Sequence, residues 1–235
     1  MYMSSKVSEN HKIYTIKEEI ANGIIHGIGT GVSIAGLTVL VVLAVFFGEP
    51  IHLVSFIVYG VSLILLYLAS TLYHSFQHPP TKRVFKIIDH SAIFILIAGT
   101  YTPFTILSIK GTLGWTFFFV IWGLALLGIF FKIAFIHKYK KVGLAIYILM
   151  GWLCILALPE MLAKIPRGGF YWLLAGGLFY TLGVIFYVWH KLPYHHAIWH
   201  VFVLMGSVCH YFAVLFYLIP VDMIQRACEY IQTIH

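Results

Sequence analysis

The sequence has little charge. Only 10% of its 235 residues are Asp, Glu, Lys or Arg, and 61% are hydrophobic. The mean hydropathy is +0.93, which is well above the range of soluble domains of this length. A chain with so few polar residues cannot cover a surface that faces water, which excludes a soluble globular protein. We therefore expect an integral membrane protein.

Other features are missing as well. The segment before residue 23 has no central apolar block and no small-residue cleavage site, so we expect no cleaved signal peptide. The three cysteines are too few, and odd in number, for a disulfide framework. The lack of an internal repeat disfavours the inverted-repeat architecture of many transporters. The net charge of +7 comes from basic residues between apolar segments, so we expect membrane lipid headgroups as partners and no nucleic acid.

What the sequence has in abundance is apolar segments that are long enough to cross a bilayer, for which about 20 residues are needed. Strands of a membrane barrel alternate apolar and polar residues, whereas residues 117–131 are apolar on every face, so the segments must be helices. The sequence thus predicts an all-α bundle with seven transmembrane helices, at residues 24–47, 53–74, 87–108, 112–134, 142–163, 168–190 and 197–219.

The basic residues predict the orientation of this bundle. Most Lys and Arg residues fall on the side of the N-terminus, and positive loops stay in the cytoplasm. We therefore expect a cytoplasmic N-terminus and a C-terminus outside. Residues 1–235 should form one domain, with a cytoplasmic segment at 1–22, the bundle at 24–219 and an extracytoplasmic tail at 220–235. Isoleucines at helical spacing predict a short interfacial helix before the first span, at Ile13, Ile16, Ile20 and Ile24.

Histidines from distant parts of the chain should meet at the cytoplasmic end of this bundle. His74 ends the second span, and His196 and His200 lie one turn apart at the start of the seventh. Two imidazoles at this spacing, with a third from another helix, form a face of three nitrogen atoms that suits Zn²⁺ and leaves a fourth position for water. We predict a zinc site at these residues, although ordinary helix packing is the alternative for the pair in the seventh span.

Two further residues at this depth could take part in chemistry. Asp89, near the start of the third span, could accept a proton from zinc-bound water as a general base, directly or through a second water. Ser70 shares a helical face with His74 and could hydrogen-bond a developing oxyanion. Asp89 could instead pair with Lys86 or cap the third helix. The other carboxylates, including Glu19, are expected away from the histidines.

The remaining histidines have lesser predicted roles. His26, at the start of the first span, should support the ligands together with Asn22, with a role as a rival ligand left open. His90 should point to another face than Asp89, and His210 should lie about 15 Å deeper than His200. Both are expected to be hydrogen-bonded core residues. Solvated loop positions are expected for His78, His137, His195 and His235.

At these residues the sequence resembles the hemolysin III family, the bacterial branch of the progestin and adipoQ receptor family, which is itself similar to the alkaline ceramidases. The resemblance covers nearly the whole chain. The matching segments are Glu19-x-x-Asn22-x-x-x-His26, Ser70-x-x-x-His74, Asp89-His90-Ser91, Ala98-Gly99-Thr100-Tyr101-Thr102-Pro103 and His196-x-x-x-His200, with His210 downstream.

This resemblance implies a seven-helix protein of the bacterial inner (plasma) membrane with a cytoplasmic N-terminus. It also implies zinc held by His74, His196 and His200, with Asp89 reaching the metal through water, in a hydrolase-like site for a lipid amide. The roles implied for the bacterial branch range from membrane-lipid homeostasis to pore-forming haemolysis.

Three functions follow as hypotheses. The first is a zinc-dependent intramembrane hydrolase of a lipid amide or ester, which the presence of Ser70 and Asp89 favours. The second is a non-enzymatic membrane regulator or sensor, in which zinc has a structural role. The third is a pore-forming cytolysin. The sequence disfavours it, because we expect neither an amphipathic pore-lining stretch nor a secretion signal.

Overall fold

A computed structural model describes residues 14–135, 139–219 and 231–233. The elements that make up this part of the chain are helices. Seven helical segments are long and apolar enough to cross a membrane, which confirms the predicted number. Their elements are α1 (Ile16–Phe47), α2 (Pro50–Ser75), α3 (Pro79–Pro103) with the π-helix η1 (Phe104–Ile109), α4 (Gly111–Phe135), α5 (Lys140–Gly151) with the 3-10 helix η2 (Leu153–Ala157) and α6 (Leu158–Lys164), α7 (Arg167–Val188), and α8 (His195–Tyr217).

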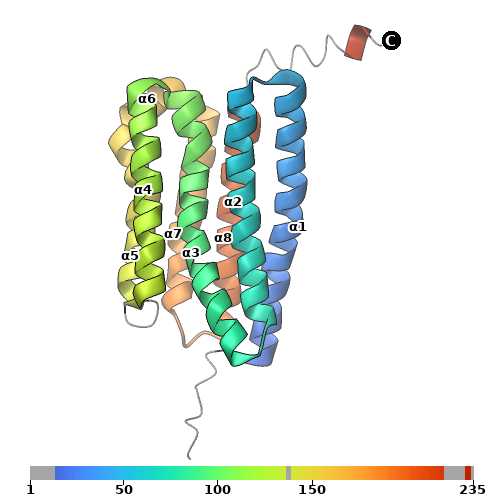
Figure 1. The fold of residues 1–235 in the computed structure, drawn as a ribbon, viewed down its shortest axis with the longest axis vertical. Helices are drawn as coiled ribbons and strands as arrows, with labels where there is room; N and C mark the ends of the chain where they lie inside the picture. Colours follow the sequence, from blue (N-terminus) through green and yellow to red (C-terminus); the bar gives the residue numbers. More distant parts are fainter. Residues whose placement is uncertain (1–13, 136–138, 220–230, 234–235) are drawn as a thin grey trace, which may run out of the picture.

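The helices form a bundle that closes between its first and last members. Neighbours in sequence pack together, and α1 also contacts α8. Figure 1 shows α1, α2, α3 and α4 side by side, with α7 and α8 behind them. The starts of α1, α3 and α8 and the end of α2 lie at the same end of the bundle, at the bottom of the view. We call this the histidine end, because His74 and His196 lie in these terminal turns.

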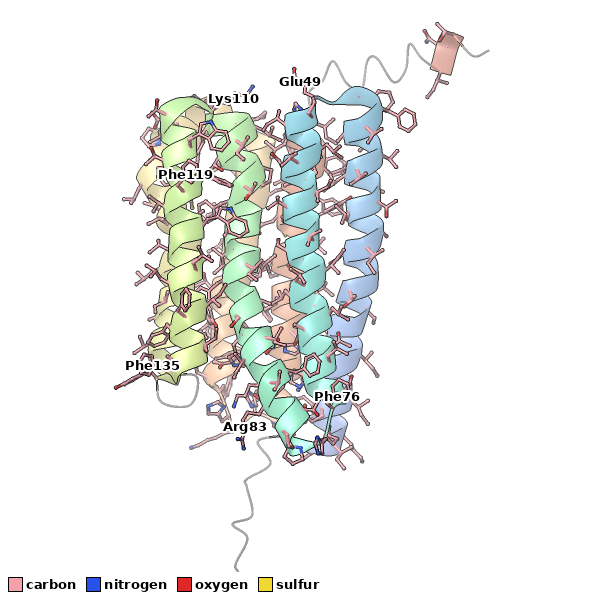
Figure 2. The ribbon with its side chains drawn as sticks, viewed as in Figure 1. Glu49, Phe76, Arg83, Lys110, Phe119 and Phe135 are labelled. Atoms are coloured by element: carbon pink, nitrogen blue, oxygen red, sulfur yellow. The ribbon has the colours of Figure 1, made fainter. Side chains whose placement is uncertain are left out.

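The side chains on the outside match a lipid environment. Phe119 is 65% exposed on the flank of α4, whereas the charged residues Arg83, Glu49 and Lys110 lie at the two ends (Figure 2). In hydrocarbon an exposed aromatic ring carries no penalty, while an exposed charge does. The described helices therefore present an apolar belt between two polar ends.

The N-terminal part of the structure differs from the prediction. Residues 16–22 do not form a separate interfacial helix but are the first turns of α1, while Ile13 lies outside the described residues. The helix begins early because Thr15 and Glu18 form a capping box, and no proline interrupts α1 after it. With 32 residues α1 is about 48 Å long, so it extends beyond a hydrocarbon core of about 30 Å.

Two of the spans are not regular α-helices. The third continues past Pro103 into the π-helix η1, and the fifth changes from α-helix to 3-10 helix after Gly151. At this break the hydroxyl of Tyr101 lies 3.0 Å from the carbonyl oxygens of both Met150 and Gly151 and accepts a hydrogen bond from the backbone N–H of Cys154. Because backbone groups in a membrane need partners within the protein, Tyr101 stabilises the broken span.

A close contact between η1 and α4 gives a test of this packing. A Cβ atom at Gly114 would collide with the backbone carbonyl oxygen of Thr105, whereas one at Gly123 on the same helix would meet no atom within 4 Å. Gly114→Ala should therefore destabilise the fold by about 1–3 kcal/mol, as overpacking does. Thermal unfolding of the purified protein in detergent measures the loss. Gly123→Ala is the control and should be neutral or slightly stabilising, because it only adds helix propensity; equal midpoints for both variants would contradict the predicted contact.

Candidate metal centre

Three histidines converge at the histidine end of the bundle. His74 comes from the last turns of α2, and His196 and His200 come from the first turns of α8. A ring nitrogen from each lies within 4.8 Å of the other two, and the residues are only 1%, 8% and 2% exposed. Three buried nitrogen donors at this spacing could bind a metal ion. The structure thus brings together the three residues that the sequence predicts as ligands.

A carboxylate fixes the orientation of the first of these rings. Oε2 of Glu19 lies 2.6 Å from Nδ1 of His74, and Oε1 of Glu19 lies 2.9 Å from Nζ of Lys82. Nδ1–H of His74 therefore donates to the carboxylate, which leaves Nε2 free for a metal. This Nε2 is buried and has no hydrogen-bond partner within the described part of the chain. A buried donor atom without a partner fits a metal ligand.

The prediction that Glu19 lies away from the histidines is wrong. Glu19 precedes the first predicted span at 24–47, so the sequence predicts it at the membrane interface. In the structure α1 begins at Ile16, and Glu19 is buried in its first turn. The sequence held a signal for this contact. Glu19, Asn22 and His26 recur at helical spacing, and all three are buried in the structure.

Asn22 and His26 contact the third histidine. The backbone carbonyl oxygen of Asn22 lies 3.4 Å from Nδ1 of His200, so the other ring nitrogen of His200 is available to a metal. The ring of His26 stacks on that of His200, with 3.6 Å between ring centroids, and Tyr67 packs edge-on against His26 at 5.0 Å. The structure therefore places both residues against one of the three clustered histidines.

The ring of Tyr14 covers the histidines from the side of the N-terminus. It stacks on His196 with 4.8 Å between ring centroids and lies 6.1 Å from His74. Burial raises the pKa of Tyr14, and neighbouring tyrosines and carboxylates act in the same direction, so the phenol keeps its proton. Tyr14 could not be predicted from the sequence, because it lies before the first helix, outside any periodic pattern.

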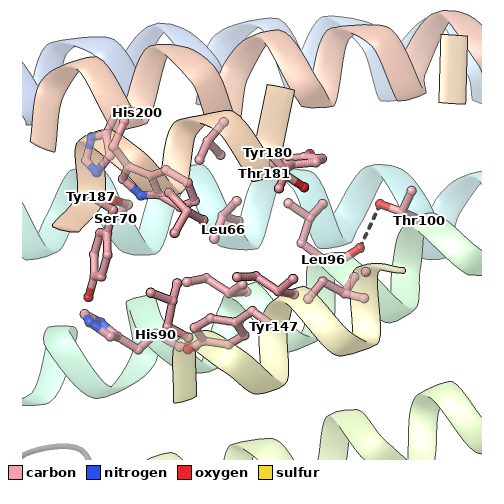
Figure 3. A pocket seen from close by; sticks show the side chains of 18 of the residues that line it. Leu66, Ser70, His90, Leu96, Thr100, Tyr147, Tyr180, Thr181, Tyr187 and His200 are labelled. Atoms are coloured by element: carbon pink, nitrogen blue, oxygen red, sulfur yellow. Dashed lines mark hydrogen bonds between the residues drawn. The ribbon is translucent and has the colours of Figure 1, made fainter. Parts of the chain in front are cut away.

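Ser70 and Asp89 line a cavity that opens onto this centre. The cavity has a volume of about 160 Å³ and is bordered by His196 and His200 as well. Oγ of Ser70 is buried and has no hydrogen-bond partner among the residues that the structure describes. In Figure 3, Ser70, His90 and His200 lie at one end of the pocket, and Thr100 and Thr181 lie toward the other.

Asp89 lies inside a helix rather than at its start. Because α3 begins at Pro79, Asp89 cannot cap this helix, and that alternative is wrong. Oδ2 of Asp89 lies 3.1 Å from Nδ1 of His90. The expectation that His90 points to another face is also wrong, since both side chains border the same cavity. A carboxylate that is buried beside an imidazole can hold or release a proton.

Two of the remaining histidines agree with the predictions and one does not. His210 is a core residue as expected, because its Nε2–H donates to the carbonyl oxygen of Leu173 at 3.1 Å. His195 is buried at the start of α8, with Nδ1 3.0 Å from the carbonyl oxygen of Phe186, so its prediction as a solvated residue is wrong. His78 is exposed as expected, before α3. The predictions for His137 and His235 lie outside the described residues.

The sequence matches the family model described as Haemolysin-III related over residues 14–211, a range that contains every residue of the centre. This chain belongs to the haemolysin-III-related family. It is 50% identical over 212 residues to the Hemolysin-3 homolog of Bacillus subtilis (strain 168), covering 90% of this chain and 100% of that relative. It is 52% identical over 205 residues to Hemolysin-3 of Bacillus cereus, covering 87% and 94%.

A more distant relative belongs to an animal. The chain is 33% identical over 177 residues to the monocyte to macrophage differentiation factor of Homo sapiens, covering 72% of this chain and 73% of the relative. These matches confirm the resemblance drawn from the motifs, including the wider progestin and adipoQ receptor family. With its seven spans, the haemolysin-III-related chain is a multi-pass membrane protein, in bacteria of the cell membrane.

The contact between Glu19 and His74 predicts the effect of a substitution on metal binding. Glu19→Gln keeps the size of the side chain but removes the charge that holds His74 in place, so the affinity for Zn²⁺ should fall roughly 10–100-fold. Competition against a chelator with purified protein measures this. Glu18→Gln is the control, because Glu18 contacts Thr15 and the backbone of Tyr194 instead of a ligand. An affinity of Glu19→Gln equal to that of the control would contradict the prediction.

The position of Tyr14 predicts the rate at which metal leaves. An aromatic stack contributes about 1 kcal/mol, so Tyr14→Ala should release Zn²⁺ to a chelator about fivefold faster. Tyr14→Phe keeps the ring and should release it at the rate of the wild type. Stopped-flow mixing with a coloured chelator follows the release. Equal rates for the Ala and Phe variants would show that the ring does not cover the metal.

Proposed function

We propose that this protein is a zinc-dependent intramembrane hydrolase that cleaves an amide bond of a membrane lipid and acts in membrane-lipid homeostasis. The observation that carries the proposal is that one cavity is bordered by two of the three clustered histidines, by the buried carboxylate of Asp89 and by the buried hydroxyl of Ser70. A purely structural metal site would need neither Ser70 nor Asp89. The rest of the cavity is lined mainly by apolar side chains, which suits an acyl chain.

Zinc is the metal that best fits the donor set. All three donors are imidazoles, and three protein ligands leave one position open, as in catalytic zinc sites. Glu19 beside His74 is the carboxylate that accompanies many histidine ligands of zinc. When bound, zinc polarises a carbonyl group and lowers the pKa of a coordinated water.

The residues of the chain then have separate roles in hydrolysis. Asp89 accepts a proton from the attacking water and returns it to the leaving amine, so that one water and one amide give an acid and an amine. The hydroxyl of Ser70 donates a hydrogen bond to the carbonyl oxygen as charge develops on it. The apolar part of the cavity holds the acyl chain and keeps bulk water away.

The charge distribution supports access from the cytoplasmic leaflet. Lys and Arg gather on the side of the N-terminus, the histidine end. We place this end in the cytoplasm, so a lipid of the inner leaflet meets the centre at the depth of its headgroup. The amide bond and the metal are then at the same level.

Hydrolysis by variants tests the proposal. Asp89→Asn should lower the rate at which zinc-loaded protein hydrolyses an N-acyl sphingoid lipid at least 100-fold, because the general base is lost. Ser70→Ala should lower it roughly 100-fold through the oxyanion. Ser55→Ala is the control, since Ser55 is buried at the other end of α2 and bonds to the carbonyl of Ile51. Mass spectrometry of the released acid measures the rates, and zinc content is measured for every variant.

A non-enzymatic regulator with structural zinc is the second candidate. It is favoured by the way the centre joins helices, since α2 and α8 supply the histidines and α1 supplies Glu19. If zinc raises the unfolding temperature of the wild-type protein and the zinc-loaded protein hydrolyses no lipid, this candidate is supported and the first is overturned. The name of the Bacillus cereus relative points to haemolysis as a third candidate function. The exposed faces of the described helices are apolar, which does not favour a water-filled pore.

A further inference from the structure

A second cavity lies beyond the first, farther from the histidines. Its volume is about 240 Å³, and its lining residues include Ala157 and Met161 of the fifth span and Phe170 of α7. Most of the residues that line it are apolar. An apolar cavity stays free of water and binds hydrocarbon. The second cavity therefore offers room for the end of an acyl chain.

The two cavities meet at a shared set of residues, which we call the wall. Six residues border both: Thr100, Tyr101, Gly151, Trp152, Gly177 and His210. Among these, the largest side chain is the indole of Trp152, at the point where α5 ends. Because the same residues border both cavities, no further layer of protein lies between the two cavities there. The indole is the part of the wall whose removal opens most space.

The indole has a defined position. Its Nε1–H donates to Oγ1 of Thr181 at 3.0 Å, and the hydroxyl of Thr181 donates to the carbonyl of Gly177. A Cβ at Gly177 would lie 3.4 Å from the indole, an ordinary van der Waals contact, so the ring packs directly beside α7. The broken backbone of the fifth span, supported by Tyr101, turns Trp152 into this position. The wall is thus built by specific contacts.

The length of the first cavity agrees with that of an acyl chain. His200 borders its metal end and His210 borders the wall, and these residues are separated by about 15 Å along α8 at the helical rise. A hydrocarbon core of about 30 Å contains two leaflets, so an acyl chain of one leaflet extends about 15 Å. A chain whose carbonyl group lies at the histidines therefore ends at the wall.

We propose that the indole of Trp152 sets the longest acyl chain that fits this protein, and that the second cavity receives the end of a longer chain when the indole is removed or displaced. The inference rests on the proposed function only for the kind of occupant, an acyl chain. Trp152 lies far from the reacting bond and acts on specificity through the tail of the lipid.

Binding of saturated fatty acids of increasing length to the purified protein tests this inference without hydrolysis. Native mass spectrometry gives two affinities, one for a chain of leaflet length and one for a chain that is two methylene groups longer. The measured ratio is the affinity of the longer chain divided by that of the shorter one. Each additional buried methylene raises affinity roughly fourfold, so two of them raise it about fifteenfold. Trp152→Ala should raise the ratio by this factor, and Thr181→Ala, which releases the indole, should raise it by less.

Two further variants locate the effect. Trp172→Ala removes an indole of α7 that packs on Phe212 and borders neither cavity, so its ratio should equal that of the wild type. Adding Ala157→Phe to Trp152→Ala fills the second cavity and should restore the ratio of the wild type.

The outcomes separate this inference from the proposed function. Ratios for Trp152→Ala and Thr181→Ala that equal the ratio for Trp172→Ala overturn the role of the wall, even if the protein hydrolyses lipid amides. A raised ratio that persists after Ala157→Phe overturns the role of the second cavity. A raised ratio that is lost with Ala157→Phe supports the inference, even where hydrolysis is absent and the proposed function fails.

Discussion

The polar end of this bundle depends on one buried carboxylate. Glu19 of α1 lies between His74 of α2 and Lys82 of α3, 2.6 Å from the imidazole and 2.9 Å from the ammonium group. Removing a carboxylate from water costs several kcal/mol unless it is paired and hydrogen-bonded, and both conditions are met here. The same contacts join three helices and determine which nitrogen of His74 faces the centre. A single set of hydrogen bonds therefore links these three helices and orients His74.

Much of this arrangement could be predicted from the sequence. Span length and hydrophobicity alone predict seven helices. Their alternating direction brings His74 to the depth of His196 and His200, although more than a hundred residues separate it from that pair. The starts of α1 and α3 could not be found from hydrophobicity, because caps and Pro79 start these helices in polar sequence. That error in α1 displaced Glu19 from the centre in the prediction. Contacts of Tyr14 and Trp152 depend on side-chain packing, which periodicity does not encode.

The distribution of polar groups divides the interior into two regions. At the histidine end, imidazoles, Asp89 and the hydroxyl of Ser70 are buried around one cavity, and the three ion pairs among the described residues lie at this end. Toward the other end the cavities are lined mainly by apolar side chains. A lipid has the same division between its headgroup linkage and its tail. For the proposed lipid substrate, this match favours one direction of entry, with the linkage at the histidines, since the reverse would place a polar group in apolar surroundings without partners.

The broken spans explain how a bundle of long helices can contain such space. Regular helices pack side chain into groove and leave few voids. Here α3 passes into a π-helix after Pro103, and the fifth span loses its α-helical hydrogen bonds after Gly151. In a membrane each freed backbone group needs a partner, which restricts where a break can occur. The hydroxyl of Tyr101 supplies partners at Met150, Gly151 and Cys154, beside the wall between the cavities. The residue that makes the break possible also borders both spaces, so the interior volume and the wall that divides it have a common structural origin.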